Sequence, residues 1–141
     1  MSGQGAGDLL RFVEAQDGVY ATALAELNAG EKRSHWMWFV FPQIEGLGLS
    51  AMAQHYAIRS RAEARDYLAH SLLGPRLREC TKAMLGHSDR PAEAILGTVD
   101  ALKFRSSMTL FDAAEPDTCF ARALDAFYRG ARDERTLALL A

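Results

Sequence analysis

The chain has 141 residues, a length typical of one domain, and its 49% hydrophobic and 24% charged residues exclude wholesale disorder. Lysine and arginine number 16 against 18 aspartates and glutamates, and this net charge of −2 argues against a protein whose main partner is nucleic acid. All apolar stretches are far shorter than the ~20 residues of a membrane-spanning helix, so no membrane partner is expected.

The first seven residues are rich in glycine and contain neither a basic residue nor an apolar run. They lack the features of a signal or transit peptide, and we expect residues 1–7 to form a disordered tail ahead of a single helical domain over residues 8–141. The two cysteines, Cys80 and Cys119, lie on apolar helical stripes and form no C-x-x-C pair. A cytoplasmic protein with two buried, free thiols is therefore expected.

Hydrophobic residues with helical spacing recur along the chain, and most runs are bounded by residue types that cap helices. The first predicted helix follows an N-cap at Asp8 and stops before Gly18. A second continues to the Asn28–Gly30 stop, so that the two form an αα-hairpin. The sequence Ser60–Glu63 is a capping-box pattern and predicts a helix through Ala69.

In the second half of the chain, predicted helices follow one another with short breaks. They are expected from Leu73 to Gly86, from Pro91 to Gly97, from Thr98 to Phe111, from Pro116 to Gly130, and after an N-cap at Asp133. The nearest candidate for a β-strand is the aromatic run Trp36–Phe41, which has no partner strand. The expected fold class is all-α, a compact single-domain bundle of about seven or eight short helices.

The segment Lys32–Gln43 holds both tryptophans of the chain, next to basic residues and a histidine. Large aromatic side chains favour the core, because each buries roughly 150–250 Å². The alternation of polar and aromatic residues also suits the wall of a pocket, in which an indole N–H and an imidazole face a ligand. The sequence leaves open whether His35, Trp36, Trp38 and Gln43 are core or pocket wall.

The predicted helix Thr98–Phe111 carries a narrow polar stripe. At 100° per residue, Asp100, Lys103 and Ser107 share one side, with apolar residues on both flanks. Arg105 is expected on roughly the opposite side of the helix. The stripe fits a structural ion pair that holds helices in register. It also fits a ligand cleft in which Lys103 binds a phosphate or carboxylate while Asp100 orients it or acts as an acid or base.

Metal-ligand patterns are absent from the sequence. The four histidines are 15 to 20 residues apart, so no two lie one turn apart on a helix, and no C-x-x-C pair exists. We expect neither a metal site nor a cofactor. The histidines are His35, His55, His70 and His87.

The same stretches carry a resemblance to a known family. The motif H-W-M-W-x-x-F-P-Q at His35–Gln43 is long and unusual. It resembles the family called domain of unknown function 1810, often mislabelled calpastatin-like. The matching stretches are Phe12–Tyr20, Gly30–Ser50, Tyr56–His70, Leu73–Cys80 and Asp100–Phe111. The resemblance implies a compact all-α fold, but no established activity, substrate or cofactor, so no residue roles are carried over.

The first functional hypothesis is a small anionic or nucleotide-like ligand, bound in a cleft lined by tryptophan, histidine and lysine. The candidate ligand-binding residues are His35, Trp36, Trp38, Gln43, Asp100, Lys103 and Ser107. The first alternative is a protein-interaction module without catalytic activity. The other is single-stranded nucleic-acid binding through Lys32, Arg33 and the tryptophans, against which the overall acidity counts. The sequence decides neither whether the protein is an enzyme nor its oligomeric state.

Overall fold

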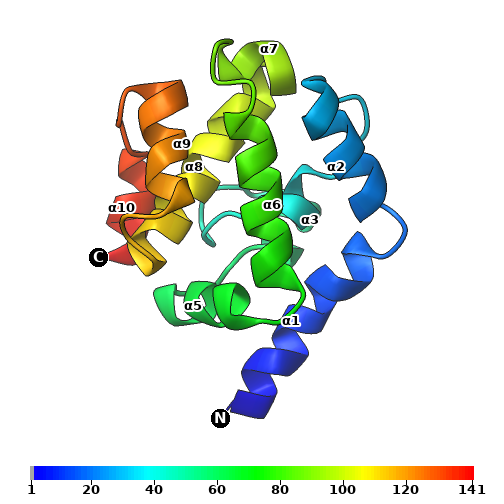
Figure 1. The fold of residues 1–141 in the computed structure, drawn as a ribbon. Coiled ribbons are helices and arrows are strands. Elements are labelled where there is room, and N and C mark those ends of the chain that lie inside the picture. Colours follow the sequence, from blue (N-terminus) through cyan, green and yellow to red (C-terminus); the bar gives the residue numbers. More distant parts are fainter. Residues whose placement is uncertain (1) are drawn as a thin grey trace.

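The structure, a computed structural model, describes the backbone of residues 2–141 and the side chains from Leu9 onward. Over this range the chain forms ten helices and no strand (Figure 1). This confirms the predicted all-α fold. The helices are α1 Ser2–Gln16, α2 Tyr20–Ala29, α3 Met37–Val40, α4 Ala51–His55, α5 Arg61–Ala69, α6 Leu73–Leu85, α7 Ala92–Leu96, α8 Thr98–Ala114, α9 Cys119–Tyr128 and α10 Glu134–Leu140.

Helix α8 is the central element of the fold. It packs against α5, α7, α9 and α10, and all six residues from Ser106 to Phe111 are buried. A helix that is covered on nearly every side has few charged residues, because a buried charge is costly. The second half of α8 follows this rule. Helix α6 packs against α2, α5 and α9 and completes the core on the other side (Figure 1).

Several predicted helix ends are confirmed by their hydrogen bonds. Helix α2 stops at Gly30, which adopts the left-handed conformation with φ of 75°. The Ser60 hydroxyl accepts a hydrogen bond from the Glu63 N–H at 3.0 Å and starts α5. The Asp133 carboxylate accepts one from the Thr136 N–H at 3.0 Å and starts α10.

Other helix starts differ from the predictions. The N-cap of α8 is Gly97 rather than Thr98, and α9 begins at Cys119 rather than at Pro116. Helix α1 begins at Ser2, ahead of the predicted N-cap at Asp8. The backbone is therefore helical over residues 2–7, where a tail was expected, while Met1 lies outside the described residues.

The segment between α2 and α5 holds the largest departures from the predicted elements. The aromatic run, the nearest strand candidate, contains the four-residue helix α3, and α4 was not predicted at all. Such one-turn helices are too short to show a periodic pattern. One isolated parallel bridge joins Ile44 to Ile58, with hydrogen bonds of 2.8 Å from the Ile58 N–H to the Gln43 carbonyl and from the Glu45 N–H to the Ile58 carbonyl. The bridge closes the loop that carries α4.

Both cysteines are buried and free, as predicted. None of the described helices is both long enough and apolar enough to span a lipid bilayer.

Candidate functional site

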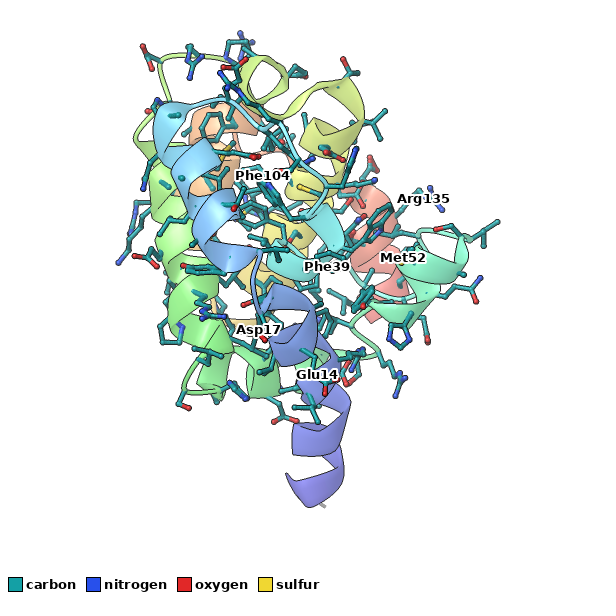
Figure 2. All side chains as sticks on the ribbon, turned by 90° about the vertical axis from the view of Figure 1, so that its right-hand side faces the viewer. Glu14, Asp17, Phe39, Met52, Phe104 and Arg135 are labelled. Carbon is teal, nitrogen blue, oxygen red and sulfur yellow. The ribbon has the colours of Figure 1, made fainter. Side chains whose placement is uncertain are left out.

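A cleft of about 460 Å³ opens between the loop that carries α4, the first half of α8 and the start of α10. The bridged loop supplies one wall, and the start of α10 brings Arg135 to the cleft. Figure 2 shows Arg135 on the same side of the molecule as Met52 of α4. The apolar part of the lining is Ile44, Leu47, Leu49, Ala53, Ala57, Val99 and Leu102. A cleft with a largely apolar wall and a few charged groups is the usual form of a small-molecule site.

Helix α8 presents one face to the cleft. Val99, Leu102, Lys103 and Ser106 all line it, and their spacing of three, four and seven residues places them on one side of the helix. Arg105 also lines the cleft, although the predicted helical wheel placed it away from Lys103. Its long side chain reaches the cleft from the edge of that face.

Lys103 lies over an aromatic ring in the cleft wall. Its Nζ is 4.1 Å from the centroid of the Trp38 ring, a cation–π contact, and 3.4 Å from Oδ1 of Asp100. Trp38 and Lys103 come from α3 and α8, so the contact joins the two segments that the sequence singled out.

Asp100 is shared between two lysines. Its Oδ2 is 2.9 Å from Nζ of Lys32, and Lys32 also donates to the Ser34 carbonyl at 2.7 Å. The Lys32 ammonium lies 5.1 Å from the Trp36 ring centroid. Lys32 therefore fastens the start of the aromatic segment to α8, on the side of Asp100 away from the cleft lining.

The Glu26 carboxylate holds the turn before α3. It accepts hydrogen bonds from the Arg33 N–H at 2.8 Å, the Ser34 N–H at 3.0 Å, the Trp36 indole N–H at 2.9 Å and the Ser34 hydroxyl. Burial raises the pKa of Glu26, but these four hydrogen bonds outweigh burial and lower the pKa to about 2. The Trp36 indole N–H is thus bound to Glu26 and does not face a ligand.

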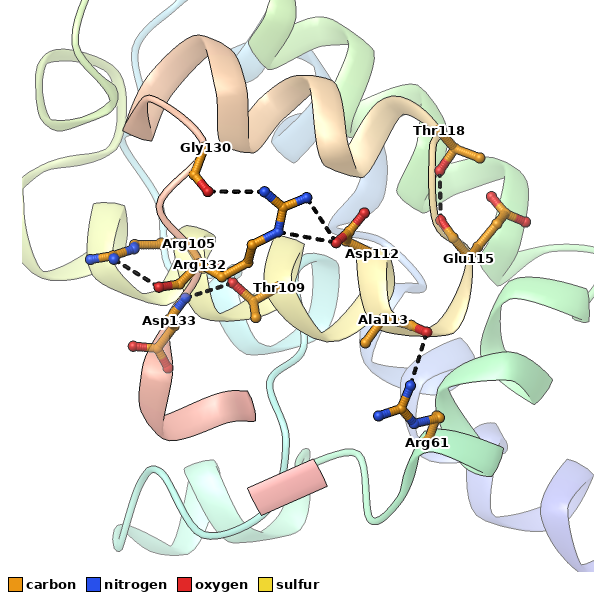
Figure 3. A network of polar contacts seen from close by, with 10 residues as sticks. All are labelled: Arg61, Arg105, Thr109, Asp112, Ala113, Glu115, Thr118, Gly130, Arg132 and Asp133. Carbon is orange, nitrogen blue, oxygen red and sulfur yellow. Dashed lines mark hydrogen bonds and ion pairs between the residues drawn. The ribbon is translucent and has the colours of Figure 1, made fainter. Parts of the chain in front are cut away.

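The opposite end of the cleft is built by the loop before α10. Nε and Nη2 of Arg105 donate to the Ala131 and Arg132 carbonyls, each at 2.8 Å, and the Asp133 N–H donates to the Thr109 hydroxyl at 2.9 Å (Figure 3). Among the residues with described side chains, Asp133 is the only acidic one in the lining. Its carboxylate accepts from Ser106 at 3.2 Å.

Three cations line the cleft against this one carboxylate: Lys103, Arg105 and Arg135. Arg135 is exposed and makes no hydrogen bond or ion pair with any residue from Leu9 onward. The surplus of positive charge is local, because the whole chain carries a net charge of −2. Clefts lined by one sign of charge attract ligands of the opposite sign.

The predicted ligand-binding residues are only partly brought together. Trp38, Gln43 and Lys103 line the cleft, and Asp100 contacts Lys103 from beside it. The other three do not line it. His35 is exposed elsewhere, whereas Trp36 and Ser107 are buried, Trp36 with only 1% of its surface exposed. The Ser107 hydroxyl has no hydrogen-bond partner among the described residues.

Sequence reasoning missed several residues of this site. Arg105 was expected on the side of α8 roughly opposite Lys103, and neither Arg105 nor Arg135 was among the candidate residues. Nothing local marks either residue, because their position depends on how α10 packs on α8. Tyr56 also lines the cleft, and its place next to a glycine-rich turn was a weak signal.

No group of three or more histidine, cysteine, aspartate or glutamate residues lies close enough to hold a metal ion in the part of the chain with described side chains.

The fold and the cleft define a small, single-domain, all-α protein with a positively charged cleft. The chain belongs to the DUF1810 family of proteins of unknown function, whose model matches residues 6–140. It is similar to the conserved hypothetical protein Rv1873 from Mycobacterium tuberculosis, known from a crystal structure at 1.38 Å. The two are 52% identical with a TM-score of 0.92, and the match covers 94% of this chain and 96% of that one. No curated protein matches. The family resemblance is therefore confirmed, and it brings no activity with it.

Proposed function

We propose that this protein binds a small organic anion with a flat or apolar body in the cleft between α8, the loop that carries α4, and the start of α10. The observation that carries the proposal is that Lys103, Arg105 and Arg135 line the same cleft as Trp38. The cations suit a phosphate, sulfonate or carboxylate, and the aromatic wall suits a ring. A nucleotide-like molecule has both parts.

The size and lining of the cleft support a small molecule. Its volume of about 460 Å³ lies within the range of roughly 300–1,000 Å³ that is typical of ligand pockets. Its lining combines an apolar wall with charged and hydroxyl-bearing side chains. The residues lining it include neither histidine nor cysteine, and the Asp133 carboxylate already caps α10. We therefore propose binding and assign no catalytic role.

A protein-interaction module is the second candidate, and one observation favours it. Leu49, Val99 and Leu102 line the cleft with large exposed surfaces, and 84% of Leu49 is exposed. Exposed apolar residues that gather in one place are typical of partner surfaces. If a partner protein covers this rim, Leu49→Asp abolishes the binding of that partner, because it places a charge in the apolar contact. The nucleic-acid alternative loses one stacking surface, since Trp36 is buried.

The test is a thermal-shift screen with nucleotides, sugar phosphates and aromatic carboxylates. A ligand present at 100 times its dissociation constant raises the free energy of unfolding by about 2.7 kcal/mol, which is a visible shift. We expect hits whose effect falls in Arg135→Gln and Lys103→Met. Arg135→Gln is the cleaner variant, because Arg135 has no described partner to lose.

Lys82→Gln is the matched control, since Lys82 is exposed on α6 and lies outside the cleft. Lys82→Gln and Arg135→Gln give the protein the same net charge. A difference in ligand binding between the two variants therefore reports the position of the charge and not the net charge. A panel without hits, or hits that respond equally to both variants, would contradict the proposal.

A further inference from the structure

The carboxylate of Asp100 lies between two lysines that differ in position and in burial. Lys32 is 2.9 Å away and its side chain is 9% exposed, whereas Lys103 is 3.4 Å away and 23% exposed. Two positive charges thus share one negative charge. The shorter contact belongs to Lys32, so Lys103 is the more loosely held of the two.

The two lysines also face different surroundings. Lys32 does not line the cleft, and the Ser34 carbonyl holds its ammonium at 2.7 Å. Glu26 in turn fixes Ser34 through two hydrogen bonds. Lys103 lines the cleft, and its other contact there is the Trp38 ring. Lys32 is therefore anchored, whereas Lys103 has room to move toward a ligand.

We propose that Lys32 is a positioning residue for anion binding: it holds the charge of Asp100, which frees Lys103 to leave Asp100 and pair with the anionic group of the ligand. This inference rests on the proposed function. Without Lys32, moving Lys103 into the cleft leaves the carboxylate of Asp100, which is only 18% exposed, without a cation. An unpaired, largely buried charge is costly, so Asp100 then competes with the ligand for Lys103.

If the role of Lys32 is electrostatic, two substitutions should change the affinity for the anion in opposite directions. Lys32→Met leaves Asp100 with Lys103 as its remaining cation and weakens anion binding, although Lys32 does not touch the ligand. Asp100→Asn removes the competitor of the ligand and strengthens binding. A merely structural role predicts that both substitutions weaken binding, because each breaks the same contact between α8 and the aromatic segment.

The experiment is a fluorescence titration with 8-anilinonaphthalene-1-sulfonate, an aromatic sulfonate that has both features of the proposed ligand. We expect the dissociation constant to rise about fivefold in Lys32→Met and to fall about threefold in Asp100→Asn, as for a unit charge a few ångströms away that is screened about as strongly as in bulk water. The double variant Lys32→Met with Asp100→Asn should return to within about twofold of the wild type, which isolates the coupling between the residues. Lys32→Arg keeps the charge and should bind like the wild type.

The outcomes separate this inference from the proposed function. No saturable binding by the wild type, or binding that ignores Lys103→Met and Arg135→Gln, counts against the proposed function and against the inference with it. Binding that needs Lys103 and Arg135 but is unchanged in Lys32→Met overturns the inference alone. If Lys32→Met does not fold, Asp100→Asn decides, since weaker binding there also overturns the inference.

Discussion

Trp36 and Trp38 show how single residues of one motif take different roles. They are two positions apart at the start of the one-turn helix α3, and such residues point to nearly opposite sides of a helix. Trp36 points into the core and bonds to Glu26, whereas Trp38 points into the cleft beneath Lys103. The open choice between core and pocket wall therefore has a different answer for each tryptophan.

Glu26 allows a test of how the turn before α3 is stabilised. Glu26→Gln keeps the shape of the side chain but replaces one acceptor oxygen by an amide that cannot accept. We expect the free energy of unfolding to fall by about 1–2 kcal/mol at pH 7, measured by urea denaturation. The matched control is Glu31→Gln, because Glu31 is exposed and its ion pair with Arg33 is also exposed, so little change is expected.

The pH dependence of stability gives Glu26 an independent signature. Its pKa is about 2 in the folded protein against an ordinary value of 4.5, so the folded state binds fewer protons than the unfolded state between these values. The stabilisation is complete above about pH 4.5 and is lost as the pH falls toward about 2. The wild type should therefore lose more stability over this range than Glu26→Gln. Parallel pH curves for the two proteins would contradict the assignment.

Trp38 can report the charge of the cleft through quenching of its fluorescence. With each ion referred to its quenching of free N-acetyltryptophanamide, iodide should quench the wild type at least about twice as efficiently as caesium, because Lys103, Arg105 and Arg135 concentrate anions near Trp38. In Trp38→Phe the remaining tryptophan is the buried Trp36, so quenching by both ions should become small. Iodide quenching that persists in Trp38→Phe would show that Trp36, and not the half-buried Trp38, is the accessible indole.

At the scale of elements, α8 shows what the predicted polar stripe could and could not indicate. The spacing correctly placed the three polar residues on one helix, but it did not indicate which parts of the chain surround each of them. Asp100, Lys103 and Ser107 do lie on one helix, but each has different neighbours. Lys103 enters the cleft, Asp100 pairs with Lys32 at its edge, and Ser107 is buried. A helical wheel gives the angle of each residue, whereas the neighbours at that angle come from other parts of the chain.

The end of α9 offers a test of helix termination. Arg129 adopts the left-handed conformation with φ of 55°, which costs a residue with a β-carbon roughly 1–2 kcal/mol. Arg129→Gly should raise the free energy of unfolding by about 0.5 kcal/mol, the relief of strain less the extra entropy of glycine in the unfolded chain. The same substitution at Arg122, which is exposed inside α9, should lower it by about 1 kcal/mol. Equal effects at the two positions would contradict this explanation.

At the scale of the whole molecule, the two buried thiols report on global unfolding. Burial raises the pKa of Cys80 to about 12 and also raises the pKa of Cys119, so the reactive thiolate is scarce as well as shielded. Both cysteines should resist a thiol reagent in the native state and react fully in denaturant. Ser88→Cys places a thiol at an exposed turn position, and its rate of reaction with the reagent serves as the reference for an unprotected cysteine. Native Cys80 or Cys119 reacting at that rate would show that the core is open.

The family and the fold class followed from the sequence, and so did part of the candidate site. Trp38, Gln43 and Lys103 were selected from unusual residue patterns, and all three line the cleft. Arg105 and Arg135 were not selected, because the surrounding sequence gives them no distinguishing pattern. Residues such as Lys32 and Asp100 are 68 positions apart, and no local signal pairs them.

The sequence by itself determined the helices other than the one-turn helices α3 and α4, because periodic apolar residues and capping side chains act over three or four positions of the chain. The capping residues Ser60 and Asp133 and the stop at Gly30 are examples. Only the tertiary structure decided where the cleft lies. The Ile44–Ile58 bridge folds one wall against α8, and the packing of α10 on α8 brings Arg135 to the other. These contacts join segments far apart in sequence, and the burial of apolar surface that drives such packing is non-directional, so it leaves no local pattern that names the partners.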